Sequence, residues 1–492
     1  MSRKFYVTTA IPYVNAEPHI GFALELVQAD VLARHRRLRG DHVRFLSGTD
    51  ENALKNVQAA EAEGVPVAEL VDRNAARFAA LRETLALSYD DFIRTSVDPR
   101  HRPGVERLWR ACGAAGDLYE RDYDGFYCTG CEAFLAEGER CGEHAAPPEP
   151  VSERNWFFRL SRYQDELLEL IESGRLRIEP DTRRNEVLAF LRAGLTDISV
   201  SRSRSRARGW GIPVPDDPSQ VVYVWFDALA NYVTALAGGL HRQWWSEDHE
   251  RLHVVGKGIL RFHAVYWPAI LLAAGERLPT TIAVHDYVTV NSDKVGKSRG
   301  NARDPDALVG RYGVDALRWW LLRESPRGSD ADFREELLVS RANDELANGL
   351  GNLVSRTIAL VRRYRPDGVD ARPTPPLGGP LPDAVARLAA TIDAALAEFD
   401  FRAAAGAIVD VVDEANRFVS TTRPWELVNA DRDDELDTVL SLLLHACGRL
   451  ADELQPFLPS GAERIATALR ELDPAVGRSL FPRLRVAEGG CP

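Results

Sequence analysis

The sequence predicts an α/β protein with a doubly wound parallel sheet, a zinc-knuckle insert and a C-terminal α-helical bundle. Apolar strand runs alternate with amphipathic helical runs in the first 115 residues and again from residue 221. Two Cys-containing turns lie between these halves, and from about residue 346 the pattern is helical throughout. A chain of 492 residues is long enough for about two to four domains.

Composition narrows the class of protein. An apolar content of 45% and a charged content of 27% are ordinary for globular proteins. The net charge of −12 argues against bulk nucleic-acid binding but permits a local basic groove. No apolar run reaches the roughly 18 residues of a membrane span, and the N-terminus lacks a signal-peptide core. Six cysteines make no disulfide framework, so we expect a cytoplasmic protein.

The first strand and helix contain a candidate phosphate site. Residues 5–9 read as a strand, and a helix with one apolar face begins near Pro18. Its N-terminal N–H groups and positive dipole end favour phosphate, His19 offers a donor, and Gly21 permits close approach of a ligand. A capped helix start with an incidental histidine explains these residues equally well when they are taken alone.

Further strands and helices continue this half. We expect a strand over 41–50, a helix to Gly64, a helix over 67–87 and a strand over 91–95. Ligands of parallel sheets bind beyond the carboxyl ends of the strands. The helix start at His19 and the strand end at Asp50 are therefore predicted to face one crevice.

Two turns predict a structural zinc site. Cys128, Cys131, Cys141 and His144 have the spacing C-x2-C-x9-C-x2-H, which closes a tetrahedral shell with no open position. Non-ligand thiols are the weaker alternative. The Arg-rich run over 201–208 reads either as a phosphate-contacting stretch or, as we favour, as a solvated loop or edge strand.

The second α/β half begins with a strand run over 221–226 and a helix over 227–237. After a strand over 253–258, Ile259, His263 and Trp267 form a stripe with helical spacing. Such stripes usually pack in a core, but a buried histidine needs a partner, which favours a pocket wall. A strand over 281–285 leads to a polar loop over 290–298, whose lysines suit a phosphate that gains charge, although a solvated loop has the same composition.

The remaining segments are predicted to be helical. An amphipathic helix is expected over 311–322, and the bundle helices are expected over 346–364, 382–398, 403–422, 434–457 and 462–472.

Taken in order, these motifs resemble the methionyl-tRNA synthetase family of class I aminoacyl-tRNA synthetases over nearly the whole chain. His19-Ile20-Gly21-Phe22 stands in place of that family's His-x-Gly-His signature, and 294–298 stands in place of Lys-Met-Ser-Lys-Ser. The Cys and His spacing matches the family's zinc knuckle. The resemblance implies five regions. The catalytic domain has its first half at 1–115 and its second half at 221–290, separated by a connective insert with the zinc knuckle at 116–220. A signature-loop region follows at 291–345, and an anticodon-binding-like bundle at 346–492.

The implied reaction is aminoacyl-adenylate formation, in which an amino-acid carboxylate attacks the α-phosphorus of ATP with Mg²⁺ present. The resemblance assigns catalytic roles to His19, Lys294, Lys297 and Ser298. It assigns ATP binding to Gly21, Glu25 and Gly256. Asp50 matches the residue that holds the substrate ammonium group. The remaining positions match family residues that line the methionine site: Ile11, Tyr13, Trp225, Ala228, Leu229, Tyr232, Ile259, His263 and Trp267.

The sequence also departs from the family pattern around the nucleotide and in the bundle. Phe22 replaces the second histidine of the first signature, and Gly258 replaces an Asp near the ribose. Val295-Gly296 replaces Met-Ser, and Asn52-Ala53 replaces His-Gly. Arg402 and Gly406 stand near the places of an anticodon-reading Asn and Arg. A late bundle Trp is absent, since Trp425 is the last one.

These departures lead us to expect a divergent paralogue with altered signatures. In this hypothesis, the enzyme activates methionine or a similar apolar amino acid and passes it to a small amine or hydroxylamine without tRNA. The alternative is a methionine–tRNA ligase that charges tRNA(Met), and a minor alternative is a non-catalytic binding protein. We expect ATP, Mg²⁺ and structural Zn²⁺, a monomer and no membrane contact.

Overall fold

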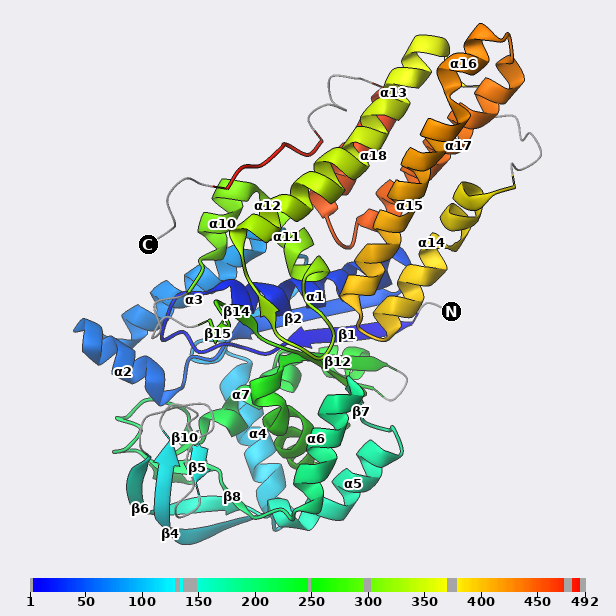
Figure 1. The fold of residues 1–492 in the computed structure, drawn as a ribbon. Helices are drawn as coiled ribbons and strands as arrows, with labels where there is room; N and C mark the ends of the chain where they lie inside the picture. Colours follow the sequence, from blue (N-terminus) through cyan, green and yellow to red (C-terminus); the bar gives the residue numbers. More distant parts are fainter. Residues whose placement is uncertain are drawn as a thin grey trace. The chain divides into compact units, whose positions relative to one another are not determined.

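The computed structural model describes residues 3–128, 133–135, 148–246, 249–295, 302–369, 378–472 and 480–486, with backbone alone at 133–135 and 294 (Figure 1). The chain forms two compact units. The first comprises Met1–Ala29, Arg39–Arg82 and Ser88–His285, and the second comprises Asp30–Leu38, Glu83–Leu87 and Asp286–Pro492. None of the helices in the described ranges combines the length and apolarity that a membrane crossing needs.

A parallel sheet lies at the centre of the first unit. Its strands are ordered β3-β2-β1-β12-β13-β7 and every neighbouring pair is parallel. The chain builds one half outward from β1 and the other outward from β12, so the topological switch point lies between these strands. The doubly wound prediction is confirmed. The strands are β1 (Lys4–Thr9), β2 (His42–Thr49), β3 (Asp91–Arg94), β7 (Arg177–Glu179), β12 (Glu250–Gly256) and β13 (Thr281–His285).

Helices supply the rest of this unit's core. In α1, the predicted apolar face at Ile20, Ala23, Leu24 and Val27 is fully buried. β1 is buried from its second residue onward, as expected for a parallel strand with both faces covered. The helices are α1 (Ile20–Leu38, whose last nine residues belong to the second unit), α2 (Leu54–Glu63), α3 (Val67–Thr84), α4 (His101–Ala114), α5 (Gln164–Glu172), α6 (Asp181–Arg192), α7 (Val224–Thr234), α8 (Leu240–Trp244) and α9 (Trp267–Ala273).

Two predicted elements of the second half are different in the structure. The predicted strand over 221–226 is wrong at its end, because β11 (Asp217–Val222) stops and α7 begins at Val224. A short apolar run does not distinguish a buried strand from a buried helix. The helix expected from Ile259 is instead a 3₁₀ turn (Lys257–Ile259) and a π-helix (Phe262–Tyr266) before α9. A 3₁₀ turn and a π-helix have different numbers of residues per turn from an α-helix, so side chains on them do not line up as they would along one α-helical face.

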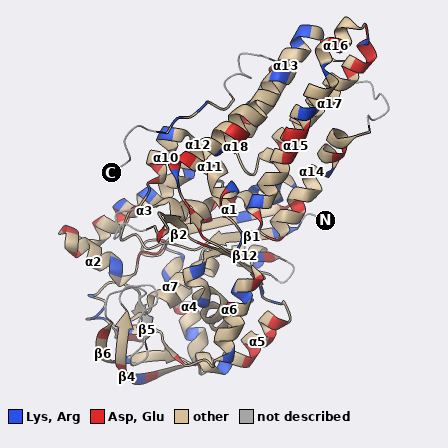
Figure 2. Cartoon of the chain, viewed as in Figure 1, with Lys and Arg blue, Asp and Glu red and all other residues tan. Residues whose placement is uncertain are grey.

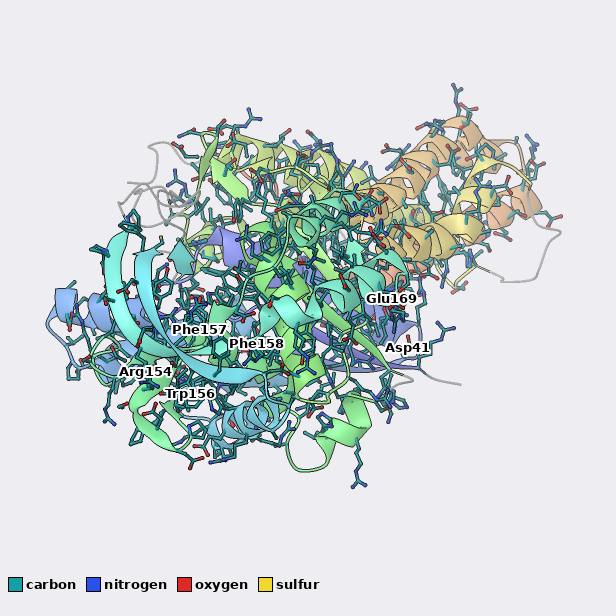
Figure 3. All side chains as sticks on the ribbon, turned by 90° about the horizontal axis from the view of Figure 1, so that it is seen from below. Asp41, Arg154, Trp156, Phe157, Phe158 and Glu169 are labelled. Carbon is teal, nitrogen blue, oxygen red and sulfur yellow. The ribbon has the colours of Figure 1, made fainter. Side chains whose placement is uncertain are left out.

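The range 116–220 contains two small antiparallel sheets. One has the order β5-β4-β6-β8, formed by β4 (Leu118–Cys128), β5 (Ala133–Leu135), β6 (Glu149–Phe158) and β8 (Ile198–Ser199). Figure 3 shows Arg154, Trp156, Phe157 and Phe158 along β6. The other has the order β10-β11-β9, with β9 (Ser201–Ser203) at its edge and β10 at Pro213–Val214.

The edge-strand interpretation of the Arg-rich run is confirmed for its first three residues. The Arg202 side chain is buried, and its guanidinium lies 4.2 Å from the ring centre of Tyr223 and 5.1 Å from that of Tyr127. Arg206 also lies over Tyr127, at 4.6 Å. These arginines therefore pack on the ring of Tyr127 on β4, and Arg202 also packs on the ring of Tyr223, which follows β11.

The second unit is mainly helical. A small sheet, β15-β14-β16, joins β14 (Val288–Val290), β15 (Asp293–Lys294) and β16 (Ala331–Asp332). The single helix predicted over 311–322 is wrong, because Gly313 has a φ of +83° and separates α10 from α11. The helices are α10 (Pro305–Tyr312), α11 (Val314–Arg323), α12 (Glu335–Arg341), a π-helix (Ala342–Gly351), α13 (Asn352–Tyr364), α14 (Pro380–Ala397), α15 (Phe401–Thr422), α16 (Pro424–Asn429), α17 (Asp433–Leu454) and α18 (Pro459–Glu471).

The predicted C-terminal bundle is confirmed. On α15, Ile408, Val411, Val412, Ala415 and Val419 are buried at the spacing of one helical face. This helix packs against α11, α13, α14 and α17. Figure 2 shows that acidic and basic residues both occur on the helices of this unit.

A buried ion pair joins separate segments of the second unit. The Arg318 guanidinium on α11 lies 2.8 Å from the Asp30 carboxylate on α1, and both side chains are fully buried. Arg318 also donates to the carbonyls of Phe457, Leu85 and Pro456 at 2.7, 2.9 and 3.0 Å. One guanidinium therefore satisfies acceptors from three separate parts of the chain.

Candidate functional site

The first part of the candidate site is the N-terminus of α1. Gly21 N–H donates to His19 Nδ1 at 3.1 Å, so the neutral His19 ring carries its proton on Nε2. A Cβ at Gly21 would lie 2.9 Å from His19 Cε1, too close for a side chain without displacement of the ring. Gly21 therefore allows the imidazole to fold over the helix start with a donor nitrogen directed away from it.

Phe22, the residue after Gly21, packs against this histidine. Its ring centre lies 4.4 Å from that of His19 and 5.4 Å from that of Phe78 on α3, in edge contact with the latter. A phenyl ring cannot donate a hydrogen bond to phosphate. In this structure it supports the ring of the histidine that can.

The second part is the loop after β2, at the carboxyl end of that strand. Asp50 is 2% exposed, its N–H donates to Pro12 O at 2.8 Å, and its carbonyl accepts from Asn56 Nδ2 at 3.2 Å. Asp50 also forms a parallel bridge with Tyr13. The backbone around Asp50 is therefore fixed by bonds that do not involve its carboxylate.

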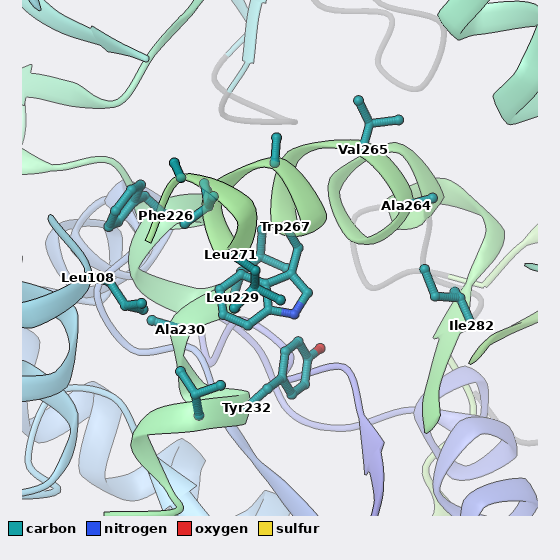
Figure 4. Close-up of a cluster of buried hydrophobic side chains, with 14 of the residues drawn as sticks. Leu108, Phe226, Leu229, Ala230, Tyr232, Ala264, Val265, Trp267, Leu271 and Ile282 are labelled. Carbon is teal, nitrogen blue, oxygen red and sulfur yellow. The ribbon is translucent and has the colours of Figure 1, made fainter. Parts of the chain in front are cut away.

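The third part is a wall of buried aromatic and apolar side chains. Ala228, Leu229 and Tyr232 come from α7, and His263 and Trp267 come from the π-helix and α9. Figure 4 shows Leu229, Tyr232 and Trp267 in this cluster, and the ring centres of Tyr232 and Trp267 are 6.0 Å apart. The structure therefore brings Leu229, Tyr232, His263 and Trp267 together, with Ala228 next to Leu229 on α7.

Hydrogen bonds define the protonation of this wall. His263 Nδ1–H donates to Ile259 O at 2.9 Å, so Nε2 accepts from the Tyr232 hydroxyl at 2.7 Å. Next to them, Trp267 N–H donates to His253 Nε2 at 3.3 Å, and His253 Nδ1 lies 2.7 Å from Thr8 Oγ1. Both imidazoles are therefore neutral, in agreement with burial that lowers the pKa of His263 to about 4 and lowers that of His253 well below its usual value.

The sequence did not single out His253, although a histidine in a buried strand was a usable signal. Its ring stacks on Tyr232 with centres 4.1 Å apart. A neutral, aromatic wall of this kind suits an apolar or thioether side chain.

Trp225 connects this wall to the Asp50 loop. Its ring is in edge contact with Tyr13, with centres 6.4 Å apart, and it stacks on Phe262 at 3.7 Å. A Cβ at Gly48 would lie 3.1 Å from Ile11 Cγ2, so Ile11 lies against the end of β2. Ile11, Tyr13 and Trp225 are all partly exposed, unlike the wall residues.

The predicted nucleotide residues Glu25 and Gly256 are brought together by His285, which sequence reasoning missed. His285 Nε2 lies 2.9 Å from Glu25 Oε2, and a Cβ at Gly256 would lie 3.4 Å from His285 Cε1. Gly256 and His285 are partners in the β12–β13 register. Their place at the carboxyl ends of neighbouring strands was the signal that could have identified His285.

Several predicted residues lie outside the described part of the chain. These are Lys297 and Ser298, the Lys294 side chain and the zinc ligands Cys131, Cys141 and His144. Cys128 is described, buried at the end of β4 opposite Ala133. Within the described residues, no group of three or more His, Cys, Asp or Glu side chains is arranged to hold a metal ion. Zinc at this motif stays a prediction.

The neutral His263 predicts a loss of stability at low pH. Its folded-state pKa of about 4 lies below the unfolded value of ~6.5, so the unfolded chain binds more protons between these pH values. The His263 contribution is complete above about pH 6.5 and is lost as pH falls toward about 4. At pH 5 the loss is about 2 kcal/mol.

We expect urea unfolding at pH 7 and pH 5 to show this loss in the wild type, and a loss about 2 kcal/mol smaller in His263→Gln. His253 is retained in both proteins, so the difference isolates His263. The exposed His42→Gln variant is the control and should behave as the wild type. Equal losses in wild type and His263→Gln would show the prediction to be wrong.

Comparisons of the sequence with a family model and with curated proteins identify the same family. The family model described as "tRNA synthetases class I (M)" matches residues 5–147 and 139–358. The Methionine–tRNA ligase of Brucella suis is 42% identical over 486 residues, which cover 95% of this chain and 92% of that protein. The Methionine–tRNA ligase of Mycobacterium tuberculosis is 41% identical over 490 residues, with the same coverage.

Solved structures of the same family also match this chain over nearly its whole length. A structure of Mycobacterium tuberculosis methionyl-tRNA synthetase bound by methionyl-adenylate has a TM-score of 0.85 at 39% identity and covers 94% of both chains. The apo form of that enzyme gives a TM-score of 0.79 at 36% identity, over 94% of this chain and 91% of that one. The present chain therefore belongs to the methionyl-tRNA synthetase family of class I tRNA synthetases and is a ligase of the aminoacyl-tRNA synthetase type.

Proposed function

We propose that the protein is a methionine–tRNA ligase, which activates methionine with ATP and transfers the methionyl group to tRNA. The observation that carries this proposal is the extent of the match to proteins of that name. Identity of 41–42% extends over 94–95% of the chain and so includes the helical bundle. A paralogue that uses a small amine acceptor has no such support, and the comparisons favour the alternative that charges tRNA.

In the proposed reaction, a methionine carboxylate oxygen forms a bond to the α-phosphorus of ATP, the bond to the β-phosphate oxygen breaks, and pyrophosphate leaves. Mg²⁺, which enzymes of this type use, supplies charge neutralisation at the phosphates. Asp50 binds the ammonium group. The wall of Tyr232, His263 and Trp267 receives the thioether.

The phosphates are placed against the N-terminus of α1. His19 donates from Nε2 to a phosphoryl oxygen, next to the backbone N–H groups of the helix start. Lys297, with help from Lys294, stabilises the charge that develops as pyrophosphate leaves. Glu25 binds the ribose. The family departure at Phe22 is compatible with this function, since its ring supports His19.

An exposed aromatic side chain in the bundle supports an RNA partner. Trp425 at the start of α16 is 36% exposed, and the Arg356 guanidinium lies 5.6 Å from its ring centre. An exposed indole beside an arginine is a surface on which unpaired bases stack. Trp425 therefore offers a stacking ring within the bundle, although the later bundle Trp of the family pattern is absent.

The proposal is tested by ATP–pyrophosphate exchange over a panel of amino acids, followed by charging of tRNA(Met). We expect exchange with methionine and subsequent charging. Lys297→Ala should lower the exchange rate by about 10²-fold or more, because a preorganised charge at the phosphates is removed. Lys4→Ala, at the start of β1, is the matched control and should exchange normally.

Two outcomes contradict the proposal. Absence of exchange with every amino acid would favour a non-catalytic protein. Exchange without tRNA charging, but with transfer to added hydroxylamines, would restore the small-acceptor hypothesis.

A further inference from the structure

A buried hydrogen-bond chain lies next to the amino-acid wall on α7. Asp227 is adjacent to the wall residue Ala228 and is 1% exposed. Its Oδ2 accepts from Asn52 Nδ2 at 2.7 Å, and its Oδ1 accepts from His101 Nε2 at 2.5 Å. Both oxygens of a buried carboxylate thus have a donor, and each donor comes from a different segment of the chain.

His101 holds α7 at two points. It is the first residue of α4 and is fully buried, and its Nδ1 lies 2.8 Å from Thr234 Oγ1. Thr234 is also on α7, about two helical turns after Asp227. His101 therefore fixes both the axial position and the rotation of the helix that carries Ala228, Leu229 and Tyr232.

Asn52 connects this helix to the Asp50 loop. It lies two residues after Asp50, and its amide also approaches Thr95 O at 3.4 Å. The next residue, Ala53, packs in a buried cluster with Tyr223 and Val224 at the start of α7. The loop and the helix are thus joined by one charge-assisted hydrogen bond and by adjacent apolar packing.

We infer that Asn52 is a positioning residue, which acts through Asp227 and His101 to set the distance between Asp50 and the wall on α7. This inference rests on the proposed function, in which Asp50 binds the ammonium group and the wall binds the side chain. A substrate that occupies both places needs them at one fixed separation. A shift of about 1 Å at a reacting group is enough to lower a rate by ~10²-fold.

The inference predicts a selective effect on the amino acid. In ATP–pyrophosphate exchange, Asn52→Ala should raise the KM for methionine on the order of 10-fold, because Asp227 Oδ2 loses its donor and the loop loses its tie to α7. The KM for ATP should stay within about 2-fold, and kcat should change less than the KM for methionine. A merely structural role would lower the melting temperature without this selective change.

A reciprocal exchange provides the rescue. Asn52→Asp alone sets two carboxylates against each other and should raise the KM for methionine further than Asn52→Ala. In the double variant Asn52→Asp, Asp227→Asn, the amide at 227 donates to the carboxylate at 52 and its oxygen still accepts from His101 Nε2. We expect the double variant to return the KM for methionine to within about 3-fold of the wild type.

Asn155→Ala is the matched control, a buried asparagine on β6 that donates to Glu153 at 2.9 Å. It should lower stability and leave the KM for methionine unchanged. The inference is overturned if Asn52→Ala leaves that KM unchanged, if Asn155→Ala raises it equally, or if a folded double variant is no better than Asn52→Asp. If the double variant does not fold, the comparison of Asn52→Ala with Asn155→Ala alone tests the inference. Failure of the wild type to exchange with methionine would instead overturn the proposed function.

Discussion

The Asp50→Asn variant is expected to lose about 10²-fold or more in kcat/KM for methionine in ATP–pyrophosphate exchange. Asp50 is 2% exposed, so the proposed charge pair with the substrate ammonium would be largely shielded from water. Asparagine keeps the shape of the side chain but removes its negative charge. The backbone bonds to Pro12 and Asn56 do not involve the carboxylate, so the loop should keep its place.

Asp117→Asn is the control for this variant. Asp117 is also fully buried in the first unit, and it accepts from Tyr163 Oη at 2.5 Å and from Arg162 at 2.9 Å. Its substitution should lower the melting temperature while the KM for methionine stays at the wild-type value. If Asp50→Asn kept the full exchange activity, the assignment of Asp50 as the ammonium-binding residue would be wrong.

The Arg318→Met variant is expected to lower the free energy of unfolding by about 3–5 kcal/mol, since it removes the fully buried partner of the Asp30 carboxylate. Asp30 would keep its contact with Arg34, at 2.9 Å. The carbonyls of Phe457, Leu85 and Pro456 would each lose a donor. Urea denaturation followed by far-ultraviolet circular dichroism measures the loss, because the second unit is mainly helical.

Arg34→Met is the matched control, because Arg34 pairs with the same carboxylate from a side chain that is 26% exposed. Partial exposure screens this pair, so we expect a loss of only about 1 kcal/mol. A double variant in which Asp30→Leu accompanies Arg318→Met should recover part of the loss, because it removes the buried carboxylate that Arg318 neutralised. Equal effects of the two arginine substitutions would show that burial of the pair does not decide its contribution.

Elements with a strong local pattern could be predicted from the sequence. The apolar face of α1, the strands β1, β2, β3 and β13 and the long bundle helices all agree with their predicted type and approximate bounds. Each pattern repeats within a few residues, so neighbouring side chains report directly on the structure. The predictions were wrong where local signals are weak, at the apolar run that opens α7, at the π-helix before α9 and at the break in front of α11.

The sequence by itself determined the family and the doubly wound class, because motif order and periodicity are properties of the chain. Tertiary structure decided which groups meet. The bond between Asn52 and Asp227 joins positions 175 residues apart, and that between Glu25 and His285 joins positions 260 apart. The tautomers of His253 and His263 also depend on such partners. No local periodicity encodes these contacts, since they arise only when parallel strands align their carboxyl ends and helices pack over them.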